Sequence, residues 1–239
     1  MTYELDDASR DARERARAAA ADARQAAAAI DSAAAIPEAL RQAARAALPP
    51  PSARRAWVVG LEELAAASGS VAVDAGWPGG PPAGSAEWPG LRGAALTAAH
   101  EASARPDGWL GIAAVLIGLG RAALAAAVEP LRDTRAATGT KPEFEHWGLA
   151  DTATELDAAR LLLWQAAESG DPTGAAMARL QARLAAEAAV AAARRVLGPA
   201  GLTRDGLLDR VGRDVATAGM IFGGPDADET AVAAGVLPG

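Results

Sequence analysis

The chain has 239 residues, enough for one large domain or two small ones with a substantial buried core. A net charge of −7 and an isoelectric point near 5.0 argue against a nucleic-acid partner, which would require a basic face to neutralise phosphates. The lack of cysteine excludes disulfides, thiol catalysis and cysteine-ligated zinc. The two histidines, His100 and His146, are far apart in sequence, so we expect no metal site.

The composition favours helices throughout. Alanine predominates, and leucine, arginine and glutamate are also strong helix formers, so we predict an all-α fold. Arginines alternate with acidic residues, a pattern typical of solvated helix faces. The acidic N-terminus lacks the features of a secretory signal, and the most apolar run, Leu110 to Gly120, is interrupted by Arg121 and is too short to span a bilayer. We therefore expect a cytoplasmic protein with no membrane contact.

The first third of the chain predicts a separate set of helices. Residues 8–34 contain no Gly or Pro and predict one long helix, although an Ala/Arg tract also fits a low-complexity segment. Shorter helices are expected over 38–48 and 53–68, and Val71 and Val73 then lead into a loop. We assign residues 1–75 to this N-terminal helical part.

Residues 76–91 are rich in Gly and Pro and predict a linker, although Trp77 and Trp88 favour a loop that docks on the helices. The remaining residues, 92–239, predict an antiparallel bundle of four main helices and a short last helix that begins at Asp226. Asp171 and Pro172 are a particularly clear helix start, an N-cap followed by proline in the first turn. The four main helices are expected over 108–135, 143–169, 173–196 and 204–222, with Pro130 kinking the first of them.

Six short passages, in the same order along the chain, resemble the acyl-CoA dehydrogenase family. Two of them lie in the N-terminal part and four in the bundle: Ala28–Asp31 with Ile36–Leu40, Glu62–Ala65 with Ala67–Ser70, Gly118–Leu124, Arg135–Gly139, Leu149–Leu163 and Arg213-Asp214. The resemblance implies N-terminal helices, a middle β-domain and a C-terminal four-helix bundle. Here the linker 76–91 stands where those enzymes have the β-domain that covers the flavin.

The resemblance also locates the catalytic base. Family members usually carry a proton-abstracting glutamate in Tyr-Glu-Gly, and the matching position here is Gly223, which cannot accept a proton. Some relatives place the base on the first bundle helix, near Gly108. Asp107 is close to it, but its neighbours favour a helix N-cap. We therefore predict no catalytic residue.

The positions that the resemblance assigns to FAD are only partly retained. Arg135 matches the arginine that meets the pyrophosphate, although it could equally be a surface arginine paired with Asp133 or Glu129. Gly139 and Gly201 remain from two glycine-containing turns, whereas Thr138 replaces an aromatic residue. We expect the isolated chain to bind no cofactor, and FAD to bind only together with a partner subunit.

The other candidate catalytic residues have no sequence neighbours that would support catalysis. His146 lies near Glu143 and Glu145, where a solvated first helical turn is expected. Trp147 and Trp164 are expected in the core. The hydroxyl residues Ser68, Ser70 and Thr154 have no neighbouring base in the sequence, so no nucleophile emerges.

These observations favour a degenerate acyl-CoA dehydrogenase homologue that acts as a non-catalytic accessory subunit. In the family, bundles associate and a flavin bound by one subunit touches its neighbour, so this chain could complete the site of a full-length subunit. The alternative is a homo-oligomer that uses the vestigial cleft to bind an acyl thioester or another small molecule, or for non-redox chemistry. A purely structural role is the third hypothesis. Either of the first two implies an oligomer.

Overall fold

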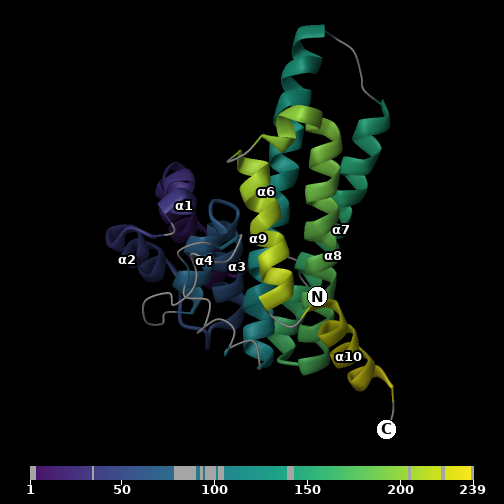
Figure 1. Cartoon of the computed structure of the whole chain (residues 1–239). Helices are drawn as coiled ribbons and strands as arrows, with labels where there is room; N and C mark the ends of the chain where they lie inside the picture. Colours follow the sequence, from purple (N-terminus) through teal and green to yellow (C-terminus); the bar gives the residue numbers. More distant parts are fainter. Residues whose placement is uncertain are drawn as a thin grey trace.

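The computed structural model describes residues 4–33, 35–77, 90–91, 94, 101, 105–138, 143–203, 206–221 and 224–237. Throughout these residues the regular structure is helical, which confirms the predicted all-α fold. The elements form two groups, N-terminal helices and a C-terminal bundle (Figure 1).

The N-terminal group contains the three helices predicted there and one more. Helices α1 (Asp7–Ala33), α2 (Glu38–Ala47) and α3 (Arg54–Ala65) agree with the predicted ranges to within a few residues. Helix α4 (Gly69–Gly76) differs from the prediction, in which Val71 and Val73 lead into a loop. Ser68 is the reason for the difference, since its hydroxyl accepts a hydrogen bond from the Val71 amide at 3.4 Å and caps a new helix.

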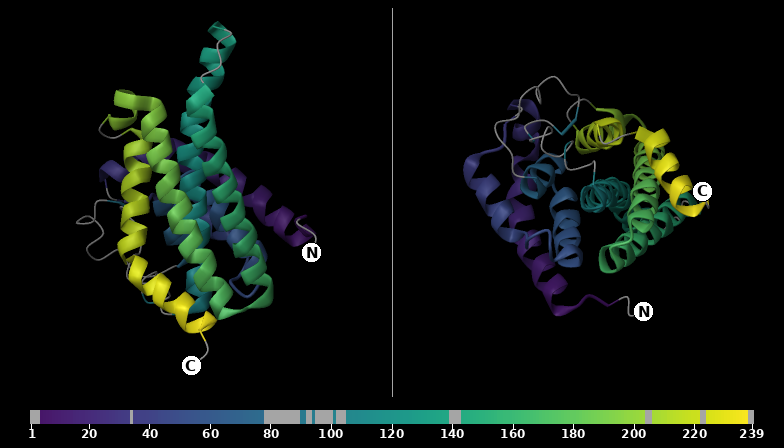
Figure 2. Two further views of the ribbon diagram at one scale, coloured as in Figure 1. Left: turned by 90° about the vertical axis from the view of Figure 1, so that its right-hand side faces the viewer. Right: turned by 90° about the horizontal axis from the view of Figure 1, so that it is seen from below.

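The bundle follows the predicted antiparallel course. It consists of α6 (Pro106–Thr138), α7 (Glu143–Ser169), α8 (Pro172–Leu197) and α9 (Leu207–Ile221), with a 3₁₀ turn at Gly198–Leu202 and a last helix α10 (Gly224–Val236). The Asp171 carboxylate accepts hydrogen bonds from the Thr173 and Gly174 amides, as its N-cap position predicts. The C-terminal end of α6 extends beyond the other helices (Figures 1 and 2).

Helix α6 is the centre of the molecule. It packs on α8, α7 and α9 on one side and on α3 and α4 on the other, so the N-terminal helices flank the bundle (Figure 2). By length and composition alone its segment Pro106–Arg132 could cross a membrane, but 72% of the apolar window is buried inside the protein. The high hydropathy of α6 is therefore explained by its position as the core helix of the bundle.

Most core side chains are alanines, and small residues allow the helices to approach closely. One such close approach is at Gly118 on α6, where an added Cβ atom would lie 2.4 Å from the Glu62 carbonyl oxygen and 2.7 Å from the Ala65 Cβ of α3. The crossing of α3 and α6 therefore depends on a residue without a side chain at this position.

We predict that Gly118→Ala destabilises the protein by about 1–3 kcal/mol, because the backbone of α3 must move to admit the methyl group. The matched control is Gly148→Ala on α7, where an added Cβ meets nothing within 4 Å. That substitution should be neutral or stabilising by up to about 1 kcal/mol, since alanine favours a helix. Chemical denaturation measures both, and equal effects of the two substitutions would refute the close-packing argument.

Candidate functional site

A carboxylate with 0% exposure lies where α3 meets the bundle. The Glu62 Oε1 atom accepts hydrogen bonds from Arg121 Nη1 of α6 at 2.7 Å and from Arg160 Nε of α7 at 2.8 Å. Its other oxygen, Oε2, is buried and accepts no hydrogen bond from the residues that the structure describes. One side chain thus ties three helices together.

The neighbouring Glu63 continues the network toward α1. Its carboxylate accepts hydrogen bonds from Arg17 Nε at 3.2 Å and from Arg121 Nη1 at 3.4 Å. It also forms an ion pair with Arg13, whose Nε lies 3.2 Å away. Burial raises the pKa of Glu63, but Arg121, Arg17 and Arg13 together hold it below its ordinary value. Burial likewise lowers the pKa of Arg121, yet the two glutamates more than offset this and raise it. Glu63 and Arg121 are therefore both charged at neutral pH.

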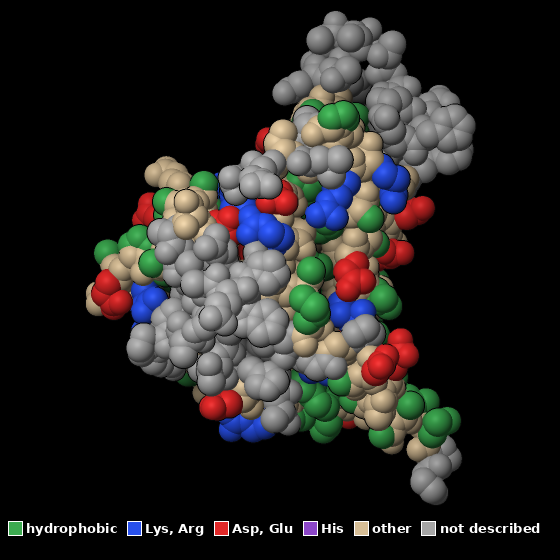
Figure 3. All heavy atoms as spheres, in the orientation of Figure 1, with side chains coloured by type: hydrophobic (Ala, Val, Ile, Leu, Met, Phe, Trp, Pro, Cys, Tyr) green, Lys and Arg blue, Asp and Glu red, His purple; other side chains and the backbone are tan. Residues whose placement is uncertain are grey.

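The interpretation of the charged residues as solvated helix faces was wrong for a definite subset. The surface in Figure 3 does show basic and acidic side chains interspersed. Inside, however, pairs of arginines four residues apart on one helix clamp a carboxylate from another helix. Besides Arg13 and Arg17 on Glu63, the pairs are Arg41 and Arg45 on Asp74, and Arg179 and Arg183 on Asp228. Such pairs share a helix face, and that spacing is the signal that could have revealed them.

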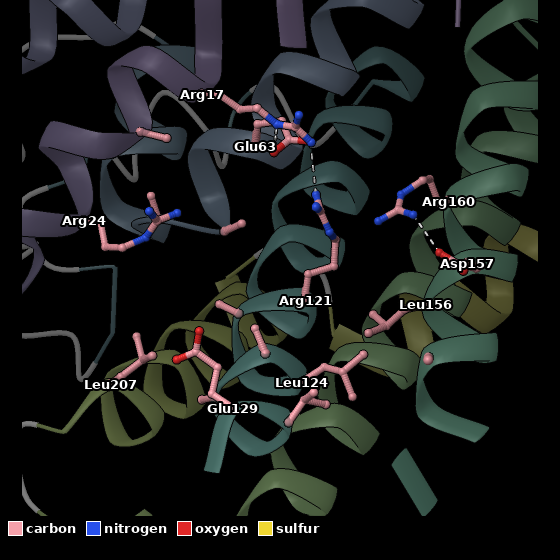
Figure 4. A pocket seen from close by; sticks show the side chains of 18 of the residues that line it. Arg17, Arg24, Glu63, Arg121, Leu124, Glu129, Leu156, Asp157, Arg160 and Leu207 are labelled. Atoms are coloured by element: carbon pink, nitrogen blue, oxygen red, sulfur yellow. Dashed lines mark hydrogen bonds and ion pairs between the residues drawn. The ribbon is translucent and has the colours of Figure 1, made fainter. Parts of the chain in front are cut away.

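Beside this network lies a cleft with a volume of about 970 Å³. Its walls come from α1, the end of α3, the middle of α6 and the first half of α7, and its apolar lining is mostly alanine. Five arginines and three acidic residues line it: Arg17, Arg24, Arg121, Arg132 and Arg160, with Glu63, Glu129 and Asp157. Figure 4 shows Arg24, Arg160 and Glu129 turned toward the same space from three helices.

Another buried carboxylate lies on α9. Asp214 accepts a hydrogen bond from the Leu91 amide at 2.5 Å, and burial raises its pKa to about 7. The adjacent Arg213 donates to both oxygens of Asp31 on α1, at 3.1 and 2.7 Å, and its Nε donates to Asp209. Two passages of the family resemblance, Asp31 and Arg213-Asp214, therefore meet in space although they lie 182 residues apart.

The residues of this network do not include the predicted FAD and catalytic positions that the structure describes, which are Arg135, Gly201 and Asp107. Arg135 lies near the C-terminal end of α6, in the part that extends beyond the bundle, and Gly201 is buried in the 3₁₀ turn. Gly139 and Gly223 lie outside the described residues. Asp107 is in the first turn of α6, exposed, and paired with Arg54 at 2.7 Å, which supports a structural role.

The remaining candidates also have structural surroundings. Trp164 is buried in the core as predicted, with the Arg13 and Arg55 guanidinium groups over its ring at 6.0 and 5.4 Å. The Thr154 hydroxyl donates to the Ala150 carbonyl of its own helix. Ser68 is the α4 cap, and the side chains of His146 and Trp147 lie outside the described part. Among described residues, no group of three or more His, Asp and Glu could hold a metal ion.

The fold is thus that of a helical-bundle protein, and in this chain buried arginine–carboxylate pairs fasten the N-terminal helices to the bundle. The model of the family described as acyl-CoA dehydrogenase, C-terminal domain, matches residues 107–236, more than half of the chain. The chain belongs to the acyl-CoA dehydrogenase family.

Its relatives differ in what their names say they do. The chain is 37% identical over 138 residues to the mitochondrial short-chain specific acyl-CoA dehydrogenase of Bos taurus, a match over 54% of this chain and 33% of that protein. It is 35% identical over 111 residues to the 3-sulfinopropanoyl-CoA desulfinase of Paraburkholderia xenovorans (strain LB400), covering 44% of this chain and 29% of the relative. The matched segments thus span about a third of these relatives.

Among solved structures, butyryl-CoA dehydrogenase from Megasphaera elsdenii is similar with a TM-score of 0.79 at 15% sequence identity, covering 100% of both chains. At this identity the likeness concerns the fold. It confirms the acyl-CoA dehydrogenase-like arrangement of the N-terminal helices and the bundle that the six sequence passages predicted.

We predict that Glu62→Gln lowers the free energy of unfolding by about 3 kcal/mol, because it leaves two arginines without their shared anion. The control is Glu155→Gln on α7, an exposed residue without a partner among the described side chains, which should change stability by less than about 0.5 kcal/mol. Urea denaturation at neutral pH measures both. A Glu62→Gln protein as stable as the control would show that the buried pairs do not fasten α3.

A separate prediction concerns pH. Native Asp214, with a pKa of about 7 against 3.8 for the free side chain, binds more protons than the unfolded chain between these values. Its contribution to stability is therefore full below about pH 4 and is lost as the pH rises through 7. Asp31, Arg213 and Arg210 are the charged groups that act on it.

Asp214→Asn should remove this dependence while keeping the acceptor for the Leu91 amide. We expect the variant to gain on the order of 2–4 kcal/mol relative to the unsubstituted protein between pH 4 and 8. Denaturation curves across that range measure it. Parallel pH profiles for the two proteins would refute the assignment of a protonated, buried Asp214.

Proposed function

We propose that this chain is a non-catalytic accessory subunit that completes a flavin-dependent acyl-CoA dehydrogenase formed with a full-length family member. The observation that carries the proposal is the glycine at the family's base position, Gly223, in a chain that keeps the family bundle. A general base must lie within hydrogen-bond reach of the proton it removes, and glycine offers no such group. Asp107, the alternative base, is engaged by Arg54.

The outer face of the bundle supports association. Leu161 on α7 and Met177 and Leu184 on α8 are 38%, 40% and 47% exposed. Met177 and Leu184 are seven residues apart and therefore on one side of α8. Exposed large apolar residues on adjacent helices are typical of an interface. The proposed occupant is the bundle of the full-length subunit, since bundles associate in the family that the chain resembles.

The domain organisation fits the same proposal. The helical parts 1–75 and 92–239 would lie against the partner, and the partner would supply the β-domain that the linker 76–91 replaces. FAD would be held mainly by the partner, with Arg135, Gly139 and Gly201 as this chain's contribution. The assembly would be cytoplasmic.

A second candidate function is favoured by one comparison. A relative at 35% identity is named a desulfinase that acts on 3-sulfinopropanoyl-CoA, so a dehydrogenase is not the only activity named among its relatives. A homo-oligomer of this chain that binds an acyl thioester, or acts on it without redox chemistry, is the corresponding proposal. It predicts thioester binding or conversion without any partner.

The test supplies the purified chain with FAD, an artificial electron acceptor and a panel of acyl-CoAs. We expect a colourless protein and no acceptor reduction above the no-protein control, because losing a general base alone costs about 10²–10⁴-fold in rate. Adding a full-length family member from the same genome should produce a mixed assembly, by light scattering, and a turnover that exceeds that of the full-length protein alone.

The interface can be tested separately. Leu184→Glu should abolish both the mixed assembly and the added turnover, since it buries a charge in the contact. Met220→Glu on α9, where the side chain is 59% exposed, is the control and should preserve both. Flavin-dependent turnover by the isolated chain would refute the proposal, and thioester conversion by the isolated chain without acceptor reduction would favour the second candidate.

A further inference from the structure

The arginine-lined cleft between α1 and α6 is distant from the family's catalytic position. It touches α9 only at Leu207, the first residue of that helix, whereas position 223 follows its last residue, Ile221. At 1.5 Å per residue, the two ends of α9 are about 20 Å apart. Along α6, Arg121 is likewise about 20 Å from Gly108. The cleft is therefore not the remnant of a site around the base position.

The charges of the cleft are not balanced. Glu63 is shared by Arg13, Arg17 and Arg121, and Arg160 is held by Glu62 and Asp157. Arg24 on α1 and Arg132 on α6 make no ion pair with any described side chain, although both line the cleft. Five arginines against three carboxylates leave an excess of positive charge here, in a chain whose net charge is −7.

The rest of the lining is apolar. Ala122, Ala125, Leu124 and Val128 of α6 and Leu156 of α7 form a floor of small and medium aliphatic side chains. A volume of about 970 Å³ is at the upper end of the range of ligand sites, which are mostly apolar with a few fixed polar groups. Because guanidinium groups bind carboxylates and phosphates through two parallel hydrogen bonds, arginines at the rim suit an oxyanion.

We propose that this cleft binds an amphipathic oxyanion, a small molecule with a phosphate or carboxylate head and an aliphatic body. The head lies between Arg24 and Arg132, and the body lies on the alanine floor of α6. The buried pairs of Glu62 and Glu63 hold Arg121 and Arg160 in place, so the cleft is preformed. Binding uses this chain alone and does not depend on a partner subunit.

The test is isothermal titration of the full chain with four probes: octyl phosphate, octanoate, inorganic phosphate and octyltrimethylammonium. We expect octyl phosphate or octanoate to bind with one site per chain, inorganic phosphate at least tenfold more weakly for lack of the body, and the cationic amphiphile not to bind. The affinity should fall with added salt. The tighter of the two oxyanions identifies the head group.

Variants locate the site. The double variant Arg24→Ala/Arg132→Ala should weaken binding at least tenfold, and Arg15→Ala/Arg105→Ala, which removes the same charge from two exposed positions outside the cleft, should change it less than twofold. Ala125→Trp should block the floor and also weaken binding at least tenfold. Circular dichroism and thermal unfolding verify that each variant is folded.

Three results would overturn the proposal. One is the absence of binding by both oxyanionic amphiphiles; another is equal binding of the cationic amphiphile, which would indicate a merely apolar surface. The third is undiminished binding by folded Arg24→Ala/Arg132→Ala and Ala125→Trp variants, which would place the probe elsewhere.

Discussion

The structure depends on one buried carboxylate. Glu62, at 0% exposure, is paired with Arg121 of α6 and Arg160 of α7, which reach it from the bundle. Removing a charge from water costs several kcal/mol, and this cost is recovered only while all three helices keep their positions. The N-terminal helices are therefore not free to separate from the bundle. The ion pairs of Glu62 with Arg121 and Arg160 fix the position of α3 on the bundle. The ion pair of Glu63 with Arg17 in turn fixes α1 on α3.

In an alanine-rich chain, buried ion pairs between helices are particularly important for stability. Burying a methyl group contributes little apolar area, at about 25 cal/mol per Å², so the core gains less from each residue than a leucine-rich one would. Alanine and Gly118 do allow close helix packing, and long arginines then bridge from one helix to the next. The result is a core that alternates small apolar residues with clamped carboxylates such as Asp74 and Asp228.

The helical course of the chain could be predicted because it depends on local signals. Asp171 and Pro172 define the start of α8, and the prolines and glycines between helices define the connections. Helix α4 could not be predicted from valine content, since its start depends on the Ser68 cap. The ion-pair network was missed because the four-residue spacing of two arginines indicates a shared helix face but not the carboxylate that this face meets. Glu62 and Arg160, for example, are 98 residues apart in the sequence.

Five of the six passages that carried the family resemblance have a common physical meaning. Glu62 and Glu63 meet Arg121 and Arg160, and Asp31 meets Arg213, so these passages fasten the N-terminal helices to the bundle. None of these ion pairs requires the β-domain or a glutamate at position 223. The fold can therefore persist when the catalytic base is absent. In a fold held together by arginines, the arginines that have no carboxylate partner among the described side chains carry uncompensated positive charge. Arg24 and Arg132 are two of these, and both line the cleft.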